Sequence, residues 1–448
     1  MSSKDKLWSK GISVDDLIEK FTIGRDKDLD VYLAPFDALG SIAHTTMLES
    51  IGLLTIEELK ELKAELINIY NQAIEGNFEI EPGVEDVHSQ IELLLTRRLG
   101  DVGKKIHSAR SRNDQVLLDI RLFSRAQLQK VVSQVAEIFR IFQESSNQHK
   151  DVLIPGYTHL QVAMPSSFGL WFGAYAESLA DDLQQVLAAY KILNQNPLGS
   201  AAGYGSSFPI NRTLTTELLG FDNLCYNVVY AQMGRGKTER VTTMALSSVA
   251  ATLAKFAADA CMFMSQNFGF ISLPAEYTTG SSIMPHKKNP DVFELLRAKC
   301  NKIQAVSNEI TLITNNLTSG YFRDLQIIKE SYFDLFDILD ECLEMVKLIV
   351  PKINVNNQIL DNSIYQYLFS VEEVNKEVLR GTPFRDAYKN VGMAIEEGNF
   401  SPETTVNHTH EGSIGNLCNE EISRKFNAIL TEFNFEKTQK AVSQLVKL

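Results

Sequence analysis

The chain has 448 residues, of which 44% are hydrophobic and 22% charged; this composition is ordinary for a soluble globular protein and argues against disorder. Its net charge of −13 argues against nucleic-acid and anionic-membrane partners, because both attract positive surfaces. The five cysteines are scattered without a CxxC pair, and no apolar leader or membrane-length apolar run is present, so we expect neither disulfides nor a membrane span and favour a cytoplasmic location.

Long helices are predicted where helix breakers are missing. Residues 1 to about 104 indicate shorter helices with a turn at NFEIEPGVED. No glycine interrupts residues 104–155 or 237–268, and no proline occurs between Pro290 and Pro351. The stretch TTMALSSVAATLAKFAADACMFM is apolar or small on nearly every face, which predicts a helix buried all round. The sequence predicts a mostly α chain with an N-terminal helical domain (1–104), a central long-helix bundle (105–351) and a small C-terminal helical domain (352–448).

The length of these helices indicates an oligomer. A helix of about 30 residues is about 45 Å long at 1.5 Å per residue, which is more than one subunit of this size easily wraps. We therefore expect several subunits to share one helical bundle.

Two polar stretches lie where helices are predicted to begin. In SARSRNDQVLLD a helix is expected from about Asp114, so that Ser111, Arg112 and Asn113 lie at its tip, where donors converge on an anion. In TTGSSIMPHKKNP (278–290), Asn289 is a good N-cap and the residues before it form a loop. Lys287 and the helix start could together hold a carboxylate.

Three motifs carry a family resemblance. GSSIMPHKKNP closely resembles the signature of the fumarase and aspartase superfamily, whose members release fumarate from a succinyl group. HSARSRNDQ and PGYTHLQVAMP resemble the same superfamily and stand in the right order along the chain. With SIAH, EDVH, SSFPINR, YFRDLQIIKE and GTPFRDAY, most of the chain resembles the argininosuccinate lyase family in particular. The resemblance implies a fumarase/aspartase-like fold, β-elimination of argininosuccinate to arginine and fumarate, no cofactor, and a homotetramer whose active sites are shared by three subunits.

The resemblance also implies roles for particular residues. Ser281 is expected to be the base that removes a proton, while Lys287 stabilises the charge that develops on the adjacent carboxylate. His159 and Glu294 are expected to act together on the leaving guanidine. The remaining residues implied to bind substrate are Ser111, Arg112, Asn113, His88, Thr158, Ser282, Asn289, Tyr321, Gln326 and Lys329.

The chain departs from the family pattern at several positions. MGRGKTER stands where the family usually has Ser-Asp-Arg-Asp, and we expect Arg235, rather than Lys237, to bind a substrate carboxylate, because a guanidinium offers two parallel hydrogen bonds. FTIGRDKDLD differs from the family's N-terminal substrate loop, whose residues therefore cannot be carried over. His286 stands where this branch commonly has glutamine. His408 and His410 form a bare HxH in a loop, and we predict no metal site.

Two other classes of function remain open. A sister lyase could act on adenylosuccinate, aspartate or malate, although different motifs would then be expected in place of SRNDQ and the run from Tyr321 to Lys329. A non-catalytic structural relative would have no need to keep Ser281, His159 and Lys287 together.

Overall fold

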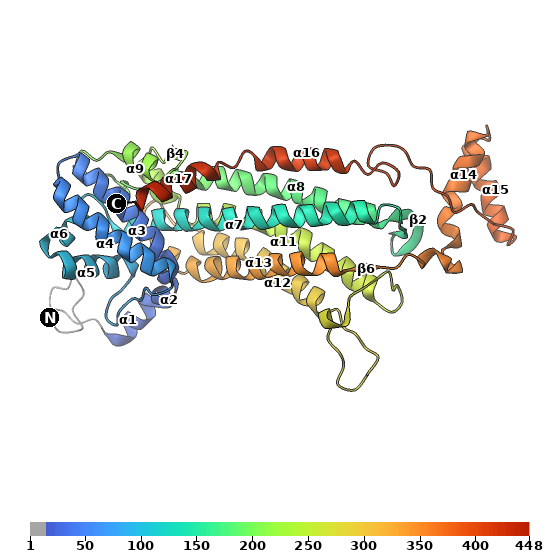
Figure 1. The fold of residues 1–448 in the computed structure, drawn as a ribbon, viewed down its shortest axis with the longest axis horizontal. Coiled ribbons are helices and arrows are strands. Elements are labelled where there is room, and N and C mark those ends of the chain that lie inside the picture. The colour runs from blue at the N-terminus through green and yellow to red at the C-terminus, as the bar shows by residue number, and fades with distance from the viewer. Residues whose placement is uncertain (1–14, 448) are drawn as a thin grey trace.

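A computed structural model describes residues 15–447, apart from the side chains of Asp16 and Glu19, and shows an elongated, mostly helical molecule (Figure 1). Its middle is a bundle of long helices that pack side by side. These are α7 (Arg112–Gln148), α8 (Phe168–Leu193), α11 (Lys237–Met264), α12 (Asp291–Thr314) and α13 (Ile328–Ile349). The predicted fold class, mostly α with a central long-helix bundle, is confirmed.

The start of α7 follows from local hydrogen bonding. Ser111 caps the helix, and its side chain and that of Asp114 form a capping box with each other's backbone. The helix therefore begins at Arg112, two residues before the position expected from the sequence.

Helix α11 is only partly enclosed within one chain. Most of its apolar side chains are buried, but Met244 is 56% exposed, so the single chain does not bury the helix on every face. By length and composition α11 is also the one helix in the described part of the chain that could cross a membrane. Of its most apolar window, 61% is buried inside the bundle, as expected for a core helix.

The proline-free stretch after Pro290 does not form one helix. Helix α12 ends at Thr314 and α13 begins at Ile328, with the short 3₁₀ helix η4 (Arg323–Gln326) between them. Asn316 and Gly320 have positive φ angles of 65° and 122°, a backbone conformation that an α-helix cannot continue. The break matters because it brings residues 320–329 to the N-terminal end of the bundle.

Shorter helices cover that end of the bundle (Figure 1). They are α1 (Asp16–Ile23), α2 (Asp26–Asp30), η1 (Val31–Leu33), α3 (Ala34–Ser50), α4 (Ile56–Ile74), α5 (Val87–Leu99), α6 (Asp101–Lys104), η2 (Lys105–His107), α9 (Arg212–Leu218) and α10 (Val228–Met233). A short parallel pair, β3 (Gln195–Asn196) and β4 (Asn223–Leu224), lies beside α9. The last helix, α17 (Phe435–Leu445), returns to pack on α3 and α9.

The opposite end carries a hairpin and a small helical unit. Strands β1 (Leu153–Thr158) and β2 (Gln161–Ser167) pair antiparallel. Helices α14 (Ser370–Leu379) and α15 (Phe384–Glu396) form a separate small core, whereas α16 (Asn419–Leu430) packs along α8. The connecting elements are β5 (Ile271–Ser272), which pairs with β6 (Asn354–Val355), and η3 (Ala275–Tyr277), η5 (Val350–Lys352), η6 (Ile359–Asp361) and η7 (Ser363–Phe369). The two boundaries between the three predicted domains stay a prediction.

Candidate active site

A pocket of about 180 Å³ lies where α1, α2, α5, the start of α7 and the segment 321–329 meet. Six residues predicted from the sequence line it: His88, Arg112, Asn113, Tyr321, Gln326 and Lys329. The sequence separates these residues by up to 241 positions, and the fold brings them together in one chain. Ser111, at the N-cap of α7, lies directly beside them and accepts a hydrogen bond from the backbone of Asn113.

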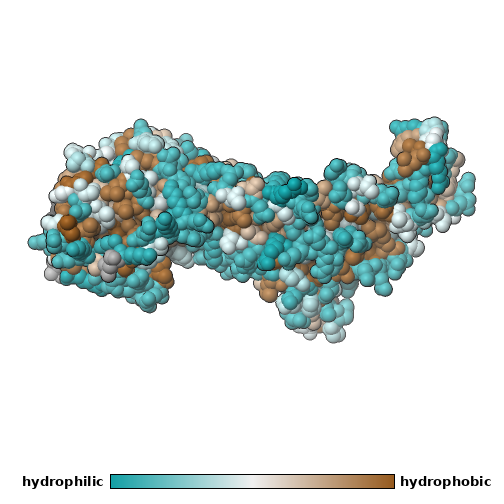
Figure 2. Space-filling view, turned by 45° about the horizontal axis from the view of Figure 1, so that its top comes forward, coloured by the Kyte–Doolittle hydropathy of each residue, from teal (hydrophilic) through white to brown (hydrophobic). Residues whose placement is uncertain are grey.

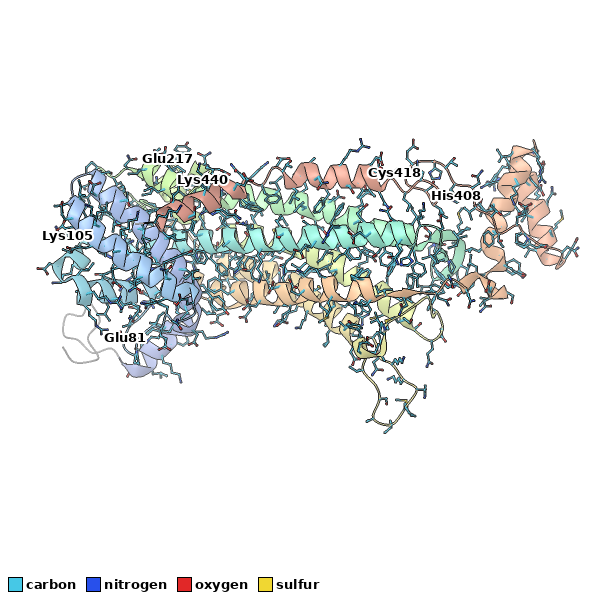
Figure 3. The ribbon with its side chains drawn as sticks, viewed as in Figure 1. Glu81, Lys105, Glu217, His408, Cys418 and Lys440 are labelled. Carbon is cyan, nitrogen blue, oxygen red and sulfur yellow. The ribbon has the colours of Figure 1, made fainter. Side chains whose placement is uncertain are left out.

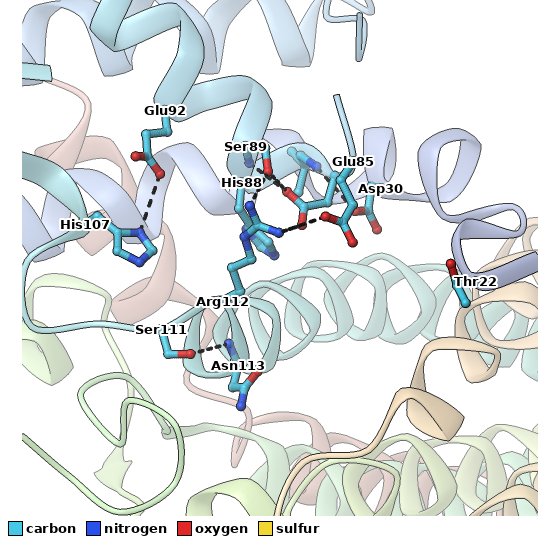
Figure 4. A network of polar contacts seen from close by, with 12 residues as sticks. Thr22, Asp30, Glu85, His88, Ser89, Glu92, His107, Ser111, Arg112 and Asn113 are labelled. Carbon is cyan, nitrogen blue, oxygen red and sulfur yellow. Dashed lines mark hydrogen bonds and ion pairs between the residues drawn. The ribbon is translucent and has the colours of Figure 1, made fainter. Parts of the chain in front are cut away.

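Arg112 is held in place by acidic and hydroxyl partners (Figure 4). Its guanidinium lies 3.3 Å from Glu85 and 3.1 Å from Asp86, and it donates a hydrogen bond of 2.8 Å to the Ser89 hydroxyl. The planar guanidinium makes several such contacts at once, which fixes its orientation at the pocket wall.

Lys329 is a buried cation held by two carboxylates. Its Nζ atom lies 2.6 Å from Asp26 and 2.6 Å from Asp30. Burial acts to lower the pKa of Lys329, but attraction by the two carboxylates exceeds this effect and raises it. Burial raises the pKa of Asp26 to about 6, against the opposing attraction of Lys329. The pocket therefore holds a carboxyl group whose pKa is well above its ordinary value.

His88 connects the pocket to a buried acidic pair. Its Nδ1 atom lies 3.4 Å from Asp37 and 3.6 Å from Asp119, and all three side chains are buried. Burial acts to lower the pKa of His88, but the carboxylates of Asp37, Asp86 and Asp30 together outweigh this effect and raise it, which favours an imidazolium beside these acids. In the described part of the chain, these three residues are the only group close enough to hold a metal ion. We assign no metal to this group.

The sequence did not point to Asp26 or Asp30. Both lie in the segment FTIGRDKDLD, which departs from the family pattern, yet α2 places them in the pocket. Glu85 was overlooked too, although it stands in the EDVH motif. The alternating aspartates of DKDLD are the sequence signal for this site, but the same pattern also occurs in solvent-exposed turns.

His159 lies at the tip of the β1–β2 hairpin. His159 and Leu160 both have positive φ angles, 53° and 58°, as the two central residues of a tight hairpin turn of the type I′ class require. Such a backbone costs about 1–2 kcal/mol for a residue with a Cβ atom. Strain of this kind is typical of functional positions. Thr158 precedes His159 at the end of β1, and both side chains are exposed.

Ser281 and Ser282 lie in a long loop that projects from the bundle just before α12, drawn in yellow in Figure 1. The Ser281 hydroxyl oxygen accepts hydrogen bonds from the backbone N–H groups of Ile283 and Met284, at 3.3 and 3.1 Å. Donors at this oxygen favour its ionised form, as a serine base requires.

The base of the loop is closed by Asn289. Its backbone N–H donates to the Thr279 carbonyl at 2.8 Å, and its side-chain amide donates to Thr279 and Gly280. The prediction that Asn289 caps the helix is wrong: α12 begins at Asp291 after Pro290, because the Asn289 side chain is turned back into the loop. Lys287 is exposed in the same loop.

The three predicted parts of the site do not meet within one chain. Helix α7 alone, with 37 residues, spans about 55 Å from the pocket at Arg112 towards the hairpin that carries His159. The loop of Ser281 projects between these two ends (Figure 1). Glu294 is exposed on the first turn of α12, and no hydrogen bond or ion pair between it and His159 is found among the described residues.

Arg235 lies in the interior, as expected, but with a protein partner. Its Nε atom donates to Glu239 at 2.9 Å, and Nη2 donates to the Leu325 carbonyl at 2.9 Å. It lines a different cavity from Lys329, so we leave its predicted contact with substrate out of the proposal below.

The three remaining histidines that the sequence analysis names have ordinary surroundings. His408 lies 2.9 Å from Glu372, far from the N-terminal pocket (Figure 3), and His410 contacts the Glu411 carbonyl. His286 is exposed in the loop of Ser281.

Comparisons with known proteins agree on the family. A family model described as lyase matches residues 3–305. The chain is 65% identical to an argininosuccinate lyase of Parabacteroides distasonis, covering 98% of this chain and 99% of that protein. It is 39% identical to an argininosuccinate lyase of Thermotoga neapolitana, covering 86% and 97%.

Solved structures share the fold. An EDDS lyase variant with bound fumarate has a TM-score of 0.75 at 21% identity, covering 96% of this chain and 93% of the other. A class II fumarase from Schistosoma mansoni has a TM-score of 0.72 at 15% identity, covering 95% and 94%.

Proposed function

The chain belongs to the argininosuccinate lyase family of the fumarase and aspartase superfamily and cleaves argininosuccinate to arginine and fumarate; we propose that it does so in active sites built from three subunits of a homotetramer. One subunit contributes the pocket of Arg112, Asn113 and Lys329. A second contributes the hairpin tip with Thr158 and His159, and a third the loop of Ser281.

The observation that carries this proposal is the separation of these parts within one chain. A small substrate cannot reach both ends of a helix about 55 Å long. Both the hairpin tip and the loop of Ser281 are exposed, so they are free to complete a pocket on a neighbouring subunit.

Apolar surface on the bundle supports subunit assembly. Met244 on α11 and Leu295 and Leu312 on α12 are each more than half exposed. Figure 2 shows hydrophobic surface spread over the elongated body. Burying apolar surface of this extent against helices of other subunits is favourable.

Ser281 removes the proton from the carbon next to the one that bears nitrogen. The electron pair enters the adjacent carboxylate, whose added charge Lys287 and the Asn289 amide stabilise. When this charge returns, the carbon–carbon double bond of fumarate forms and the carbon–nitrogen bond breaks. His159, whose orientation Glu294 supports, assists the protonation of the nitrogen, which leaves as the guanidino group of arginine.

The pocket of Lys329 suits the arginine end of the substrate. That end carries an ammonium group and a carboxylate, and the pocket offers carboxylates of Asp26 and Asp30 beside the Lys329 ammonium. Gln326 is held by donating its amide to the carbonyls of Thr22 and Ile23, which ties the N-terminal helix to this wall.

Mixing inactive variants tests the shared site. His159→Asn and Ser281→Ala should each be inactive, but subunits exchanged between them at equal amounts should regain about one quarter of the wild-type activity, since about one quarter of the sites then draw both intact residues from different chains. The matched control mixes Ser281→Ala with Asn289→Ala. Both residues lie in one loop, so no site can obtain an intact loop. Recovery in the control, or none in the test pair, would contradict the proposal.

The substrate is tested separately. Fumarate absorbance should rise with argininosuccinate and stay at baseline with adenylosuccinate, aspartate and malate. Faster turnover of one of the other three would assign the chain to a sister activity.

A further inference from the structure

A larger cavity, of about 490 Å³, lies at the start of α11 and takes no part in the proposed reaction. It is lined by Gln232, Met233, Arg235, Lys237, Arg240, Thr314, Leu317, Thr318, Ser319, Gly320, Phe322 and Leu325. The segment 320–326 separates it from the pocket of Lys329, because Phe322 lines this cavity whereas Tyr321 and Arg323 line the other. We call it the α11 cavity.

The α11 cavity is cationic on an acidic protein. Three of its lining residues, Arg235, Lys237 and Arg240, carry positive charge, and no acidic residue is among the described residues that line it. The whole chain has a net charge of −13. Cations gathered in a recess with low-dielectric walls concentrate the field there and attract anions.

One of these cations has an unused donor. The Arg235 side chain is 2% exposed, and Glu239 and the Leu325 carbonyl occupy Nε and Nη2. Its Nη1 atom is buried and has no partner among the residues that the structure describes. A buried donor without a partner is unfavourable, and native proteins almost always satisfy it. A ligand oxygen in the α11 cavity would do so.

The start of α11 does not itself supply the attraction. Glu239 Oε2 already accepts the N–H of Gly236 at 2.8 Å and a hydrogen bond from the Thr238 hydroxyl. The charge available to a ligand therefore comes from side chains. Lys237 is exposed and lies over the Tyr230 ring at 5.4 Å, and no carboxylate is paired with Lys237 or Arg240 in the described part of the chain.

We propose that the α11 cavity binds a small oxyanion, a phosphate or a carboxylate, through Arg235 Nη1, Lys237 and Arg240. Guanidinium and ammonium groups form their strongest hydrogen bonds with such oxygens. The hydroxyls of Thr318 and Ser319 add donors, and the apolar side chains of the lining accept a short hydrocarbon part of a carboxylate ligand. The proposal does not depend on the identity of the reaction.

Calorimetry on the purified full-length protein tests the site. Sodium phosphate is titrated in one arm and sodium fumarate in the other, at constant ionic strength, because the two probes represent the two sources of oxyanion. Wild-type protein is compared with Lys237→Gln/Arg240→Gln and with the charge-matched control Arg385→Gln/Lys389→Gln on the distant helix α15.

At least one probe should bind the wild type and the control with the same dissociation constant. Its dissociation constant for the cavity variant should be at least about tenfold higher, which corresponds to roughly 1.4 kcal/mol. Fumarate that binds only in the active site would bind all three proteins equally. Equal binding to the two variants, or no binding of either probe to the wild type, would overturn the proposal.

A second measurement needs no variant. Acetic anhydride acetylates exposed lysines, and mass spectrometry follows the modification of Lys237 and of Lys389 in the wild-type protein. The probe that binds should slow acetylation of Lys237 and leave Lys389 unchanged. If neither probe changes the rate at which Lys237 is acetylated, the proposed site is contradicted.

Discussion

The ammonium nitrogen of Lys329 lies 2.6 Å from the Asp26 carboxylate, and this contact joins α2 to α13 across the pocket. Lys329 was expected from the sequence, whereas Asp26 was not. Because burial raises the pKa of Asp26 to about 6, its charge changes within the range in which enzymes are assayed.

Asp26→Asn should raise the KM for argininosuccinate at least about tenfold at pH 8, because the variant lacks the charge proposed to bind the substrate's cationic end. The difference should shrink as the pH falls below about 6, where the wild-type carboxyl is itself protonated and resembles the amide. Steady-state kinetics between pH 5 and 8 measures this convergence.

The matched control is Asp28→Asn on the same short helix, where the carboxylate is exposed and lines no part of the pocket. Its KM should equal that of the wild type at every pH. A constant ratio of KM between Asp26→Asn and wild type across this range would show that Asp26 charge plays no part in binding.

Ser281→Ala should lower kcat by about 10³-fold or more, since it removes the proposed base. Ser282→Ala should have a milder effect, because the family resemblance implies only a supporting role for that hydroxyl. Both side chains lie in an exposed loop, so the melting temperature and the oligomeric state should not change. Stopped-flow detection of fumarate gives kcat, and near-normal turnover of Ser281→Ala would remove Ser281 from the mechanism.

Local patterns in the sequence predict that a helix exists better than they predict the residues at which it begins and ends. The glycine-free runs gave α7 and α11, because a long stretch without breakers has few alternatives to a helix. The end of α12 was missed since Asn315 and Asn316 are weaker signals than proline or glycine. The N-cap of α12 was misplaced because Asn289 has competing partners in its own loop.

The candidate site was predictable only where a motif carried it. Arg112, Asn113 and Lys329 stand in stretches that resemble the family, and the fold gathers them. Asp26 and Asp30 lie about 300 positions before Lys329, and no local pattern reports a contact over that separation. The predicted pairing of His159 with Glu294 is not formed among the described residues of one chain, so it stays a prediction that depends on neighbouring subunits.

His44 should make the fold sensitive to acid. Burial and the nearby Arg110 charge together lower the pKa of His44 to about 3, although its Nε2 atom contacts the Ser108 carbonyl at 2.8 Å. A histidine with a depressed pKa stabilises the fold above its ordinary pKa of 6.5, and this contribution is lost as the pH falls towards 3.

Compared with His44→Gln, the wild type should therefore lose stability by up to about 1.4 kcal/mol per pH unit between pH 6.5 and 3. Glutamine can keep the hydrogen bond to Ser108 but does not titrate. Denaturant unfolding of both proteins at a fixed protein concentration measures the difference. This comparison separates the contribution of His44 from that of the other groups that titrate in the same pH range. If the unfolding free energies of the two proteins change with pH in parallel, titration of His44 does not contribute to the loss of stability in acid.

The buried pair of Arg235 and Glu239 should be more important for stability than for catalysis. Arg235→Met leaves the Glu239 carboxylate buried without its charged partner and should reduce the free energy of unfolding by about 3–5 kcal/mol. Arg235→Met/Glu239→Gln removes both charges while the amide can still accept the N–H of Gly236, so it should be less destabilised than Arg235→Met alone. Lys237→Met, at an exposed neighbouring position, should change stability by less than about 0.5 kcal/mol. Denaturation midpoints rank the three variants; a double variant less stable than Arg235→Met would show that the Glu239 charge is needed for the cap of α11 rather than for Arg235.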